Sequence, residues 1–322
     1  MRIVVLDGYT LNPGDNPWTG LERLGTLEVH PRSTPEQVPA RAREADVLVV
    51  NKVRLDAPLL EALPRLKFIA VTATGHDGVD LGAARARGIL VANVPEYGTD
   101  SVAQWVIAAL LYFCHRVDWH DQAVRAGQWT GQEDFCFWLS PQQELAGKTI
   151  GIIGFGRIGR RVGQLAHALG MYVLAHTPRP GQPPWEGNFA WCEREPLLRR
   201  SDVVSLHCPL TPETIGMVDR PFLDQLQPSA ILMNSSRGGL VVEHELARAL
   251  NERRLAGAAL DVVSHEPIQP HNPLLLARNC LLTPHLAWAT LAARQRLMAA
   301  TADNVAAFLA GRPRNLVQTP ET

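Results

Sequence analysis

The 322-residue chain has no excess of charge of either sign. Lys and Arg number 31 and Asp and Glu number 32, which gives a formal net charge of −1. A near-neutral balance provides no electrostatic basis for binding nucleic acid or an anionic membrane surface. We therefore expect neither of these as a partner.

Cysteines are few, and their spacing shows no paired motif. There are five, an odd count, with no CxxC spacing. This pattern argues against a disulfide framework and favours free thiols in a reducing compartment. We expect no bound metal. The cysteines are Cys114, Cys136, Cys192, Cys208 and Cys280.

Long hydrophobic runs are also missing. The apolar run near the N-terminus, within residues 1–8, is short and ends in turn residues, so it predicts a strand rather than a signal peptide. The most apolar helical segment, Val102 to Cys114, contains Gln104 and is too short to span a bilayer. With 46% hydrophobic and 20% charged residues, the composition is that of a soluble globular protein. We expect a cytoplasmic protein.

The length favours two domains, and the first hundred residues alternate between short β-rich runs and helical patterns. This alternation predicts a small parallel α/β sheet. The predicted strands are Ile3–Leu6, Val47–Val50, Phe68–Val71 and Leu90–Val94, and the predicted helices are Pro35–Glu44, Pro58–Leu63 and Val79–Arg87.

A second α/β unit begins near Leu145. Before it, a long helix is predicted from a cap at Asp100-Ser101 to about Arg116, followed by a Trp- and Phe-rich irregular stretch. Six strands with helical crossovers, such as Arg160–Leu169 and Glu243–Asn251, predict a doubly wound nucleotide-binding sheet. The predicted strands are Thr149–Ile153, Tyr172–Ala175, Val203–Leu206, Ala230–Asn234, Gly257–Leu260 and Cys280–Leu282.

The last segment, from about Ala289 to Leu309, is predicted to be a helix that could return to the first domain. The expected fold is α/β, with two Rossmann-like doubly wound parallel-sheet domains. Residues 1–99 and 289–322 would form a discontinuous substrate domain, and residues 100–288 a dinucleotide-binding domain with a dimerisation arm.

A glycine loop, Gly154-Phe-Gly-Arg-Ile-Gly159, lies between a predicted strand and a predicted amphipathic helix. Gly154 would allow the tight turn, Gly156 would let the backbone approach a pyrophosphate, and Gly159 would let helix and strand pack closely. The helix N-terminus would supply amide donors and a positive dipole. This context predicts a dinucleotide site, the alternative being a glycine-rich turn without a ligand.

The acidic residue that normally follows the second strand of this fingerprint is missing. Its place falls near Thr177, where no carboxylate is available, and Arg179 lies two residues further on. Without the acid there is no repulsion of a 2′-phosphate, and an arginine can pair with one. The sequence therefore favours NADP over NAD. The alternative is a solvated loop arginine in an enzyme that uses NAD.

Three polar residues follow late strands, at the sheet edge where open α/β sheets bind ligands. They are Arg237, Glu266 and His285. Each alone has an ordinary structural explanation. In series, beside a dinucleotide fold, they predict a catalytic site.

These features together resemble the D-isomer-specific 2-hydroxyacid dehydrogenase family, most of all its glycerate dehydrogenase/hydroxypyruvate reductase branch. The resemblance covers essentially the whole chain, and the ordered set of glycine loop, Arg, Glu-Pro and Pro-His is specific to it. It extends to Leu6-Asp-Gly-Tyr-Thr-Leu-Asn-Pro-Gly-Asp15, Ala73-Thr-Gly-His-Asp-Gly-Val-Asp80, Val94-Pro-Glu-Tyr-Gly-Thr-Asp-Ser-Val-Ala103 and His207-Cys-Pro-Leu-Thr-Pro-Glu-Thr214.

The resemblance implies hydride transfer between NAD(P)H and a small 2-keto acid, with hydroxypyruvate and glyoxylate as candidates. His285 would be the general acid, and the base in the reverse direction. Glu266 would hydrogen-bond its other ring nitrogen and favour the imidazolium. Arg237 would bind the substrate carboxylate or polarise the ketone. The loop Thr74-Gly75-His76 would supply backbone amides to the carboxylate, and His76 stands where the family often has another residue.

The resemblance also implies contacts with the cofactor and a homodimer formed through an aromatic arm around Trp119–Trp138. For that arm, the alternative is a small core within one chain. Beyond the three glycines, the resemblance implies that Arg157 and Ile158 contact the pyrophosphate, and that Cys208 and Pro209 border the adenosine. Thr214 would contact a phosphate, Asp261 the carboxamide, and Ser101 the phosphates or the nicotinamide. Thr177 and Arg179 would lie at the ribose.

Other functions remain open at this point. Formate oxidation is disfavoured because that branch has Gln in the place of Glu266, whereas phosphite oxidation is less easily excluded. A dinucleotide-sensing corepressor or scaffold could keep the same residues. The missing basic or disordered tails and the complete series of site residues argue against it.

Overall fold

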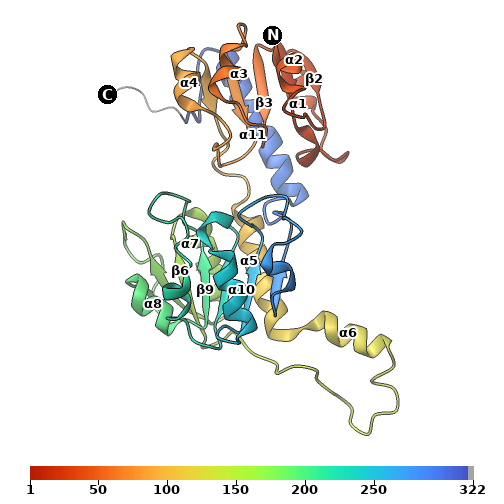
Figure 1. Ribbon diagram of the computed structural model, residues 1–322, viewed down its shortest axis with the longest axis vertical. Helices are drawn as coiled ribbons and strands as arrows, with labels where there is room; N and C mark the ends of the chain where they lie inside the picture. Colours follow the sequence, from red (N-terminus) through yellow and green to blue (C-terminus); the bar gives the residue numbers. More distant parts are fainter. Residues whose placement is uncertain (318–322) are drawn as a thin grey trace. The chain divides into compact units, whose positions relative to one another are not determined.

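The computed structural model describes residues 1–317, which fall into two compact units. Unit 1 comprises Met1–Gly98 together with the chain from Trp288 onward, and unit 2 comprises Thr99–Ala287 (Figure 1). Unit 1 is therefore discontinuous in sequence.

Unit 1 contains a parallel five-stranded sheet in the order β2-β1-β3-β4-β5. The strand order reverses at β1, which lies between β2 and β3. The central strands β3 and β4 are buried along their whole length, because helices cover both faces of the sheet. The strands are β1 (Arg2–Val5), β2 (Thr26–Val29), β3 (Val47–Val50), β4 (Phe68–Val71) and β5 (Leu90–Ala92).

The helices of unit 1 are mostly short, and α11 (Leu291–Leu309) is the long one. It brings the end of the described chain back to the sheet, where the ring of Phe308 stacks on that of Phe68 at 4.5 Å. The other helices are η1 (Gly8–Thr10), α1 (Thr19–Glu22), α2 (Val38–Ala42), α3 (Ala57–Glu61) and α4 (Leu81–Ala86).

Unit 2 contains a parallel seven-stranded sheet in the order β12-β11-β10-β9-β6-β7-β8. Hydrophobic cores lie on both of its faces. The strands are β6 (Thr149–Ile153), β7 (Tyr172–His176), β8 (Phe189–Trp191), β9 (Val203–Leu206), β10 (Ile231–Asn234), β11 (Gly257–Leu260) and β12 (Cys280–Leu282).

Within unit 2, α5 (Thr99–His115) packs against α7 (Arg157–Ala168) on one face of the sheet. A left-handed residue, Arg116 at φ 46°, separates α5 from α6 (Val117–Arg125). Figure 1 shows α6 and the segment after it leading away from the sheet of this unit. The remaining helices are α8 (Arg194–Arg200), α9 (Arg220–Leu223), η2 (Gly238–Leu240), α10 (Glu243–Asn251) and η3 (Pro273–Leu276).

The predicted fold class is confirmed: both units are parallel α/β sheets covered on two faces. Every predicted strand is present, but β2, β8 and α6 were not predicted. The predicted cap at Asp100-Ser101 is wrong, because α5 already begins at Thr99. Among residues 1–317, no helix combines the length and the apolar character needed to cross a membrane.

Candidate active site

The three predicted catalytic residues follow three neighbouring strands of unit 2. Arg237 follows β10, Glu266 follows β11 and His285 follows β12, and these strands are adjacent in the sheet. Since all strands are parallel, their carboxyl ends lie at one edge of the sheet. The topology therefore brings residues that are 19 or more positions apart in the sequence to the same edge.

His285 and Glu266 form a close hydrogen-bonded pair. The imidazole Nδ1 lies 2.6 Å from the Glu266 Oε2 atom. An ionised carboxylate can only accept, so Nδ1 carries the hydrogen, and Nε2 is left as the ring nitrogen that can exchange a proton with a substrate. The two side chains are 27% and 33% exposed, so a small molecule can reach them.

The backbone at His285 is strained, because its φ of 53° lies in the left-handed region. Asp261 holds this segment in place. Its carbonyl accepts the His285 N–H at 2.8 Å, and its carboxylate accepts from the amides of Leu286 and Ala287, both at 2.9 Å, and from the Thr283 hydroxyl. Burial raises the pKa of Asp261, and these hydrogen bonds counteract the rise. The His285 imidazole thus sits on a loop tied to the end of β11.

Arg237 is positioned by its own backbone. Its carbonyl accepts from the Asn234 side-chain amide at 2.8 Å, and its Nη1 donates to the Ser236 carbonyl at 2.9 Å. The next residue, Gly238, packs so tightly that an added Cβ would lie 1.9 Å from the carbonyl carbon of Val263. The chain can therefore turn after Arg237 only with glycine at this position.

The glycine loop follows β6, in the middle of the same sheet. Gly154 has φ 92°, and a Cβ there would lie 2.5 Å from the amide nitrogen of Cys208. A Cβ on Gly159 would lie 2.1 Å from the Gly154 carbonyl oxygen. Protein packing alone therefore explains these two glycines, as the sequence predicted.

Gly156 differs from the other two, because no protein atom lies within 4 Å of the position that its Cβ would take. It is the N-cap of α7, whose first two residues are Arg157 and Ile158 and whose first turn has no acidic residue. The amides of this turn have no partner within the helix and carry the positive end of its dipole. Open space at the one glycine that packing does not require fits a bound pyrophosphate.

Ser235 gives a second sign of a ligand at this edge. It follows β10, and its hydroxyl oxygen is buried without a hydrogen-bond partner among the described residues. Buried hydroxyls are nearly always hydrogen-bonded in folded proteins. A bound dinucleotide or substrate could supply the missing partner, so the residues present fit a nicotinamide cofactor.

The end of β7 lines a cavity of about 200 Å³. Thr177 lies in its wall, as does Glu193, a carboxylate that the sequence argument missed. Glu193 comes 16 residues later and reaches this cavity because β8 pairs with β7, with Trp191 opposite Ala175. Arg179 is exposed in the loop after β7 and is not part of the cavity wall.

Other predicted cofactor residues lie in the loop after β9. The Thr214 hydroxyl donates to the Pro209 carbonyl at 2.7 Å and accepts from the Thr211 amide at 2.8 Å, so it closes this loop on itself. Burial raises the pKa of the Cys208 thiol. The preceding His207 packs against Gly154, and its Nε2 lies 2.8 Å from the Ser205 hydroxyl.

Ser101, near the start of α5, is buried and donates to the Ala287 carbonyl at 2.6 Å. Ser101 therefore contacts the segment that follows His285. Asp261 holds the same segment through its bond to the Ala287 amide. Ser101 and Asp261, both predicted cofactor residues, thus hydrogen-bond the backbone of the same residue, Ala287.

The loop at 74–76 belongs to unit 1 and follows β4. It is anchored at Thr74, whose hydroxyl donates to the Val94 carbonyl at 3.1 Å and whose carbonyl accepts from the Asn93 side chain at 2.7 Å. The His76 Nδ1 atom is buried and has no hydrogen-bond partner in the part of the chain that the structure describes.

Comparison with known proteins gives one consistent result. Residues 107–287 match the family described as D-isomer specific 2-hydroxyacid dehydrogenase, NAD binding domain. A hydroxypyruvate reductase from Blautia hydrogenotrophica is 47% identical over 320 residues, which is 98% of this chain and 99% of the relative. A glycerate dehydrogenase from Methylorubrum extorquens is 40% identical over 287 residues, 88% of this chain and 89% of the relative.

Among solved structures, an NADPH-dependent glyoxylate/hydroxypyruvate reductase from Sinorhizobium meliloti, in complex with NADP and malonate, superposes with a TM-score of 0.82. It is 31% identical, and the match covers 98% of this chain and 96% of that one.

Proposed function

Because the chain belongs to the D-isomer-specific 2-hydroxyacid dehydrogenase family, and so is an NAD(P)-dependent oxidoreductase, we propose that it reduces hydroxypyruvate to D-glycerate and glyoxylate to glycolate. The two relatives named as a hydroxypyruvate reductase and a glycerate dehydrogenase support this choice of substrate. The bound nicotinamide supplies hydride to the 2-carbon, and the residues of this chain provide the proton and hold the substrate.

The observation that carries the proposal is the 2.6 Å contact between His285 and Glu266 at the carboxyl edge of the sheet. With Nδ1 bonded to a carboxylate, the ring is oriented and its tautomer is fixed, with Nε2 free to exchange a proton. His285 Nε2 would then donate a proton to the carbonyl oxygen as hydride reaches the neighbouring carbon. In the reverse direction the neutral ring would accept the proton.

Arg237 is proposed to bind the substrate carboxylate or the ketone oxygen. Its guanidinium has donors in a planar fork, which suits a carboxylate better than a point charge does. Support comes from its place after β10, next to the strand that precedes Glu266. The loop Thr74-Gly75-His76 of unit 1 stays a predicted carboxylate-binding loop, and the unpartnered His76 Nδ1 is consistent with a ligand there.

Turnover assays test the reaction directly. Purified protein should oxidise NADPH or NADH in the presence of hydroxypyruvate or glyoxylate, followed as absorbance loss at the reduced nicotinamide band. No absorbance loss with either substrate and either cofactor would contradict the proposal. His285→Ala should lose roughly 100-fold or more of kcat, the range for general acid catalysis, while cofactor binding stays unchanged. A variant with wild-type kcat would remove His285 from the acid role.

The cofactor site has a test that does not depend on activity. Gly156→Ala meets no protein atom, so its thermal stability should stay close to that of the wild type. The added methyl group would occupy the space proposed for the pyrophosphate, so the Kd for the cofactor, measured by calorimetry, should rise at least about tenfold. An unchanged Kd would place the pyrophosphate elsewhere.

We further propose a preference for NADP. Arg179 is exposed, lies two residues after Thr177, and has no hydrogen-bond or ion-pair partner within residues 1–317, so it is available to pair with a 2′-phosphate. Glu193 opposes this preference, because its carboxylate shares a cavity wall with Thr177. Thr177→Asp combined with Arg179→Ala should raise KM for NADPH far more than KM for NADH. An unchanged ratio would mean that this loop does not recognise the 2′-phosphate.

A homodimer is also proposed, formed through the arm that contains α6 and the residues up to Trp138. Trp129 is 51% exposed, Phe135 88% and Trp138 69%, so these rings do not form a closed core within one chain. Aromatic side chains are enriched in protein interfaces. Sedimentation of the wild type should give about twice the monomer mass, and Phe135→Asp with Trp138→Asp should shift it to the monomer. A wild-type monomer would contradict this assembly.

The cytoplasmic location predicted from the sequence remains part of the proposal. All five cysteines are free in the structure, as a reducing compartment favours.

A further inference from the structure

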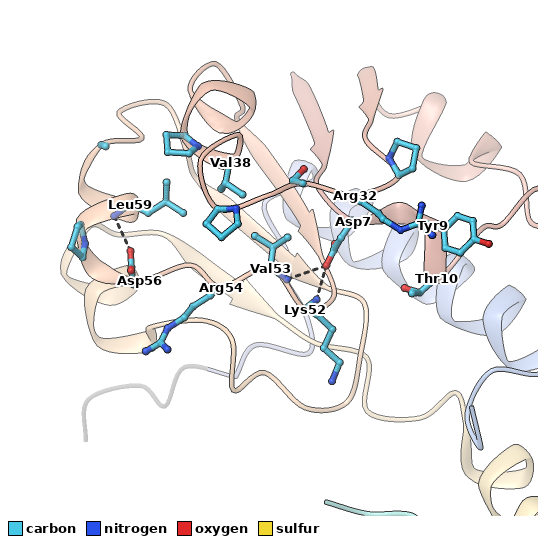
Figure 2. A pocket seen from close by; sticks show the side chains of 16 residues that line it. Asp7, Tyr9, Thr10, Arg32, Val38, Lys52, Val53, Arg54, Asp56 and Leu59 are labelled. Atoms are coloured by element: carbon cyan, nitrogen blue, oxygen red, sulfur yellow. Dashed lines mark hydrogen bonds between the residues drawn. The ribbon is translucent and has the colours of Figure 1, made fainter. Parts of the chain in front are cut away.

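Unit 1 contains a cavity of about 800 Å³ that is lined by none of the proposed active-site residues. Its wall is made entirely of residues between Asp7 and Ala62, at the carboxyl edge of the sheet (Figure 2). Asp7 and Thr10 come from the segment after β1, and Lys52, Val53 and Arg54 come from the segment after β3. The volume falls within the range of roughly 300–1,000 Å³ typical of small-molecule sites.

The topology places this cavity where open α/β sheets bind ligands. The order β2-β1-β3-β4-β5 reverses at β1, and the ends of β1 and β3 diverge toward helices on opposite sides. A crevice forms at such a reversal point, outside the carboxyl ends of the strands, and ligands of this fold class occupy it. Position and volume thus point independently to a binding site.

The middle of the cavity wall is apolar and stiff. It contains Val38, Val53 and Leu59, and also four prolines, whose rings fix the backbone φ. A wall of this kind keeps its shape without a ligand, which lowers the entropy cost of binding. The prolines are Pro31, Pro35, Pro39 and Pro58.

Two carboxylates in the wall are engaged by backbone amides. Asp7 accepts from the amides of Asn51 at 2.9 Å, Lys52 at 2.6 Å and Val53 at 3.0 Å, which fixes the segment after β3. Asp56 caps α3 by accepting from the Leu59 amide at 3.1 Å. Backbone donors already stabilise both negative charges, and among the described residues neither carboxylate forms an ion pair with a cation of the wall.

Three cations remain in the wall: Arg32, Lys52 and Arg54. Arg32 lies 3.9 Å from the centre of the Tyr9 ring, a stacking that holds the guanidinium while leaving its edge N–H groups exposed to a ligand. Lys52 and Arg54 have no ion pair in the part of the chain that the structure describes. In Figure 2, Arg54 lies on one side of Val53, and Arg32 with Tyr9 lies on the other. The cavity therefore has an apolar middle flanked by positive charge.

We propose that this cavity binds a small organic anion with a compact apolar body, at a site separate from the keto-acid site. The apolar body would lie against Val38, Val53 and Leu59. Its carboxylate, sulfonate or phosphate would be held by Arg32 or Arg54 through charge-assisted hydrogen bonds.

Calorimetry with 2-naphthoate as the probe tests this site in the full chain saturated with NADP or NAD. The wild type should bind 2-naphthoate, and the uncharged 2-naphthamide should bind at least about tenfold more weakly, since a hydrogen bond to a charged group is lost. Arg32→Ala and Arg54→Ala should each raise the Kd for 2-naphthoate at least about threefold, and their double variant about tenfold. Arg23→Ala, which removes an exposed arginine of unit 1 outside the cavity wall, is the matched control and should leave the Kd unchanged.

A variant that fills the space separates volume from charge. Ala62 lines the cavity and is exposed, so Ala62→Trp should abolish 2-naphthoate binding while the melting temperature stays near that of the wild type. If this variant fails to fold, the arginine variants still decide the question. Absence of 2-naphthoate binding by the wild type, equal binding of 2-naphthamide, or an unchanged Kd in the double arginine variant would each overturn the inference.

Competition distinguishes this site from the proposed substrate site. Hydroxypyruvate at saturating concentration should leave the Kd for 2-naphthoate unchanged, and displacement by hydroxypyruvate would assign the cavity to the substrate and overturn the inference. Because binding is measured by heat rather than by turnover, the result stands even if the proposed keto acids are not reduced.

Discussion

His207 should make unit 2 sensitive to acid, because its ring is held in the neutral form. It follows β9 and packs against Gly154 of the glycine loop, and its Nε2 lies 2.8 Å from the Ser205 hydroxyl. Burial lowers the pKa of His207 from 6.5 to about 4. The native state therefore resists protonation at a pH where the unfolded chain already accepts the proton.

The direction in which stability changes with pH follows from the order of the two pKa values of His207, the lower one in the native state and the higher one in the unfolded state. Above pH 6.5 both states are neutral at His207, and stability is complete. As the pH falls from 6.5 toward 4, only the unfolded state gains the proton, so the free energy of unfolding falls. A difference of 2.5 pKa units corresponds to at most about 3.4 kcal/mol, at about 1.4 kcal/mol per unit. Between pH 7 and pH 5 the same linkage removes about 2 kcal/mol.

Urea unfolding at pH 7 and pH 5 measures this loss when wild type and His207→Gln are compared. Glutamine can keep a hydrogen bond to Ser205 but does not titrate, so the variant should lose about 2 kcal/mol less than the wild type over this interval. Titration of all other groups cancels in the comparison. Tryptophan fluorescence suits the assay, because six of the eight tryptophans lie in unit 2, among them Trp185 and Trp191 beside Phe155. Equal losses in the two proteins would refute the assignment of a neutral His207.

Three shorter predictions concern the active-site edge. Gly238→Ala should lower the melting temperature sharply, since its Cβ would lie 1.9 Å from the Val263 carbonyl carbon and overpacking costs about 1–3 kcal/mol or more; an unchanged melting curve would contradict the packing. Glu266→Gln should reduce kcat about 10- to 100-fold with an unchanged Kd for the cofactor, because the charged acceptor that orients the His285 ring through Nδ1 is lost; equal kcat would remove that role. Glu193→Gln should lower KM for NADPH relative to NADH by up to about fivefold, the range of an exposed charge pair, and a ratio that moves the other way would count against repulsion of the 2′-phosphate.

Most strands that were predicted to the residue are buried on both faces, and the edge strand Cys280–Leu282 is the exception. Val47–Val50 and Val203–Leu206 are continuous apolar runs because helices cover both sides of the sheet. The two missed strands, β2 and β8, lie at sheet edges and are at most half-buried. Thr26 and Glu28 interrupt the apolar pattern of β2, whereas β8 is apolar but only three residues long.

Helix α6 was missed for a related reason. Ala123 is its one buried residue; the helix is amphipathic but only nine residues long, and Val117, Trp119 and Val124 are exposed. The end of the helix before it, near Arg116, was predicted to within a residue, and the left-handed backbone there explains the break.

The grouping of the candidate catalytic residues at one sheet edge could be predicted because it depends on strand order alone. Residues that follow parallel strands meet at one edge, so Arg237, Glu266 and His285 needed no distances to be grouped. Their support could not be predicted in the same way. The carboxylate of Asp261 holds the backbone after His285 through contacts 25 and 26 residues away, and no local pattern encodes such contacts.

Cofactor choice depends on a register that the sequence did not reveal. Ala175 of β7 lies opposite Trp191 of β8, an offset of 16 residues, and two residues beyond this pair Thr177 and Glu193 line one cavity. In the proposed cofactor site, Glu193 from the segment after β8 would thus partly replace the acid that is missing from the end of β7. In the proposed site, Arg179 would attract a 2′-phosphate and Glu193 would repel it, so the proposed preference for NADP requires that the arginine dominates. In a double-mutant cycle, Arg179→Ala and Glu193→Gln should change the NADPH/NADH ratio in opposite directions, which separates the two charges.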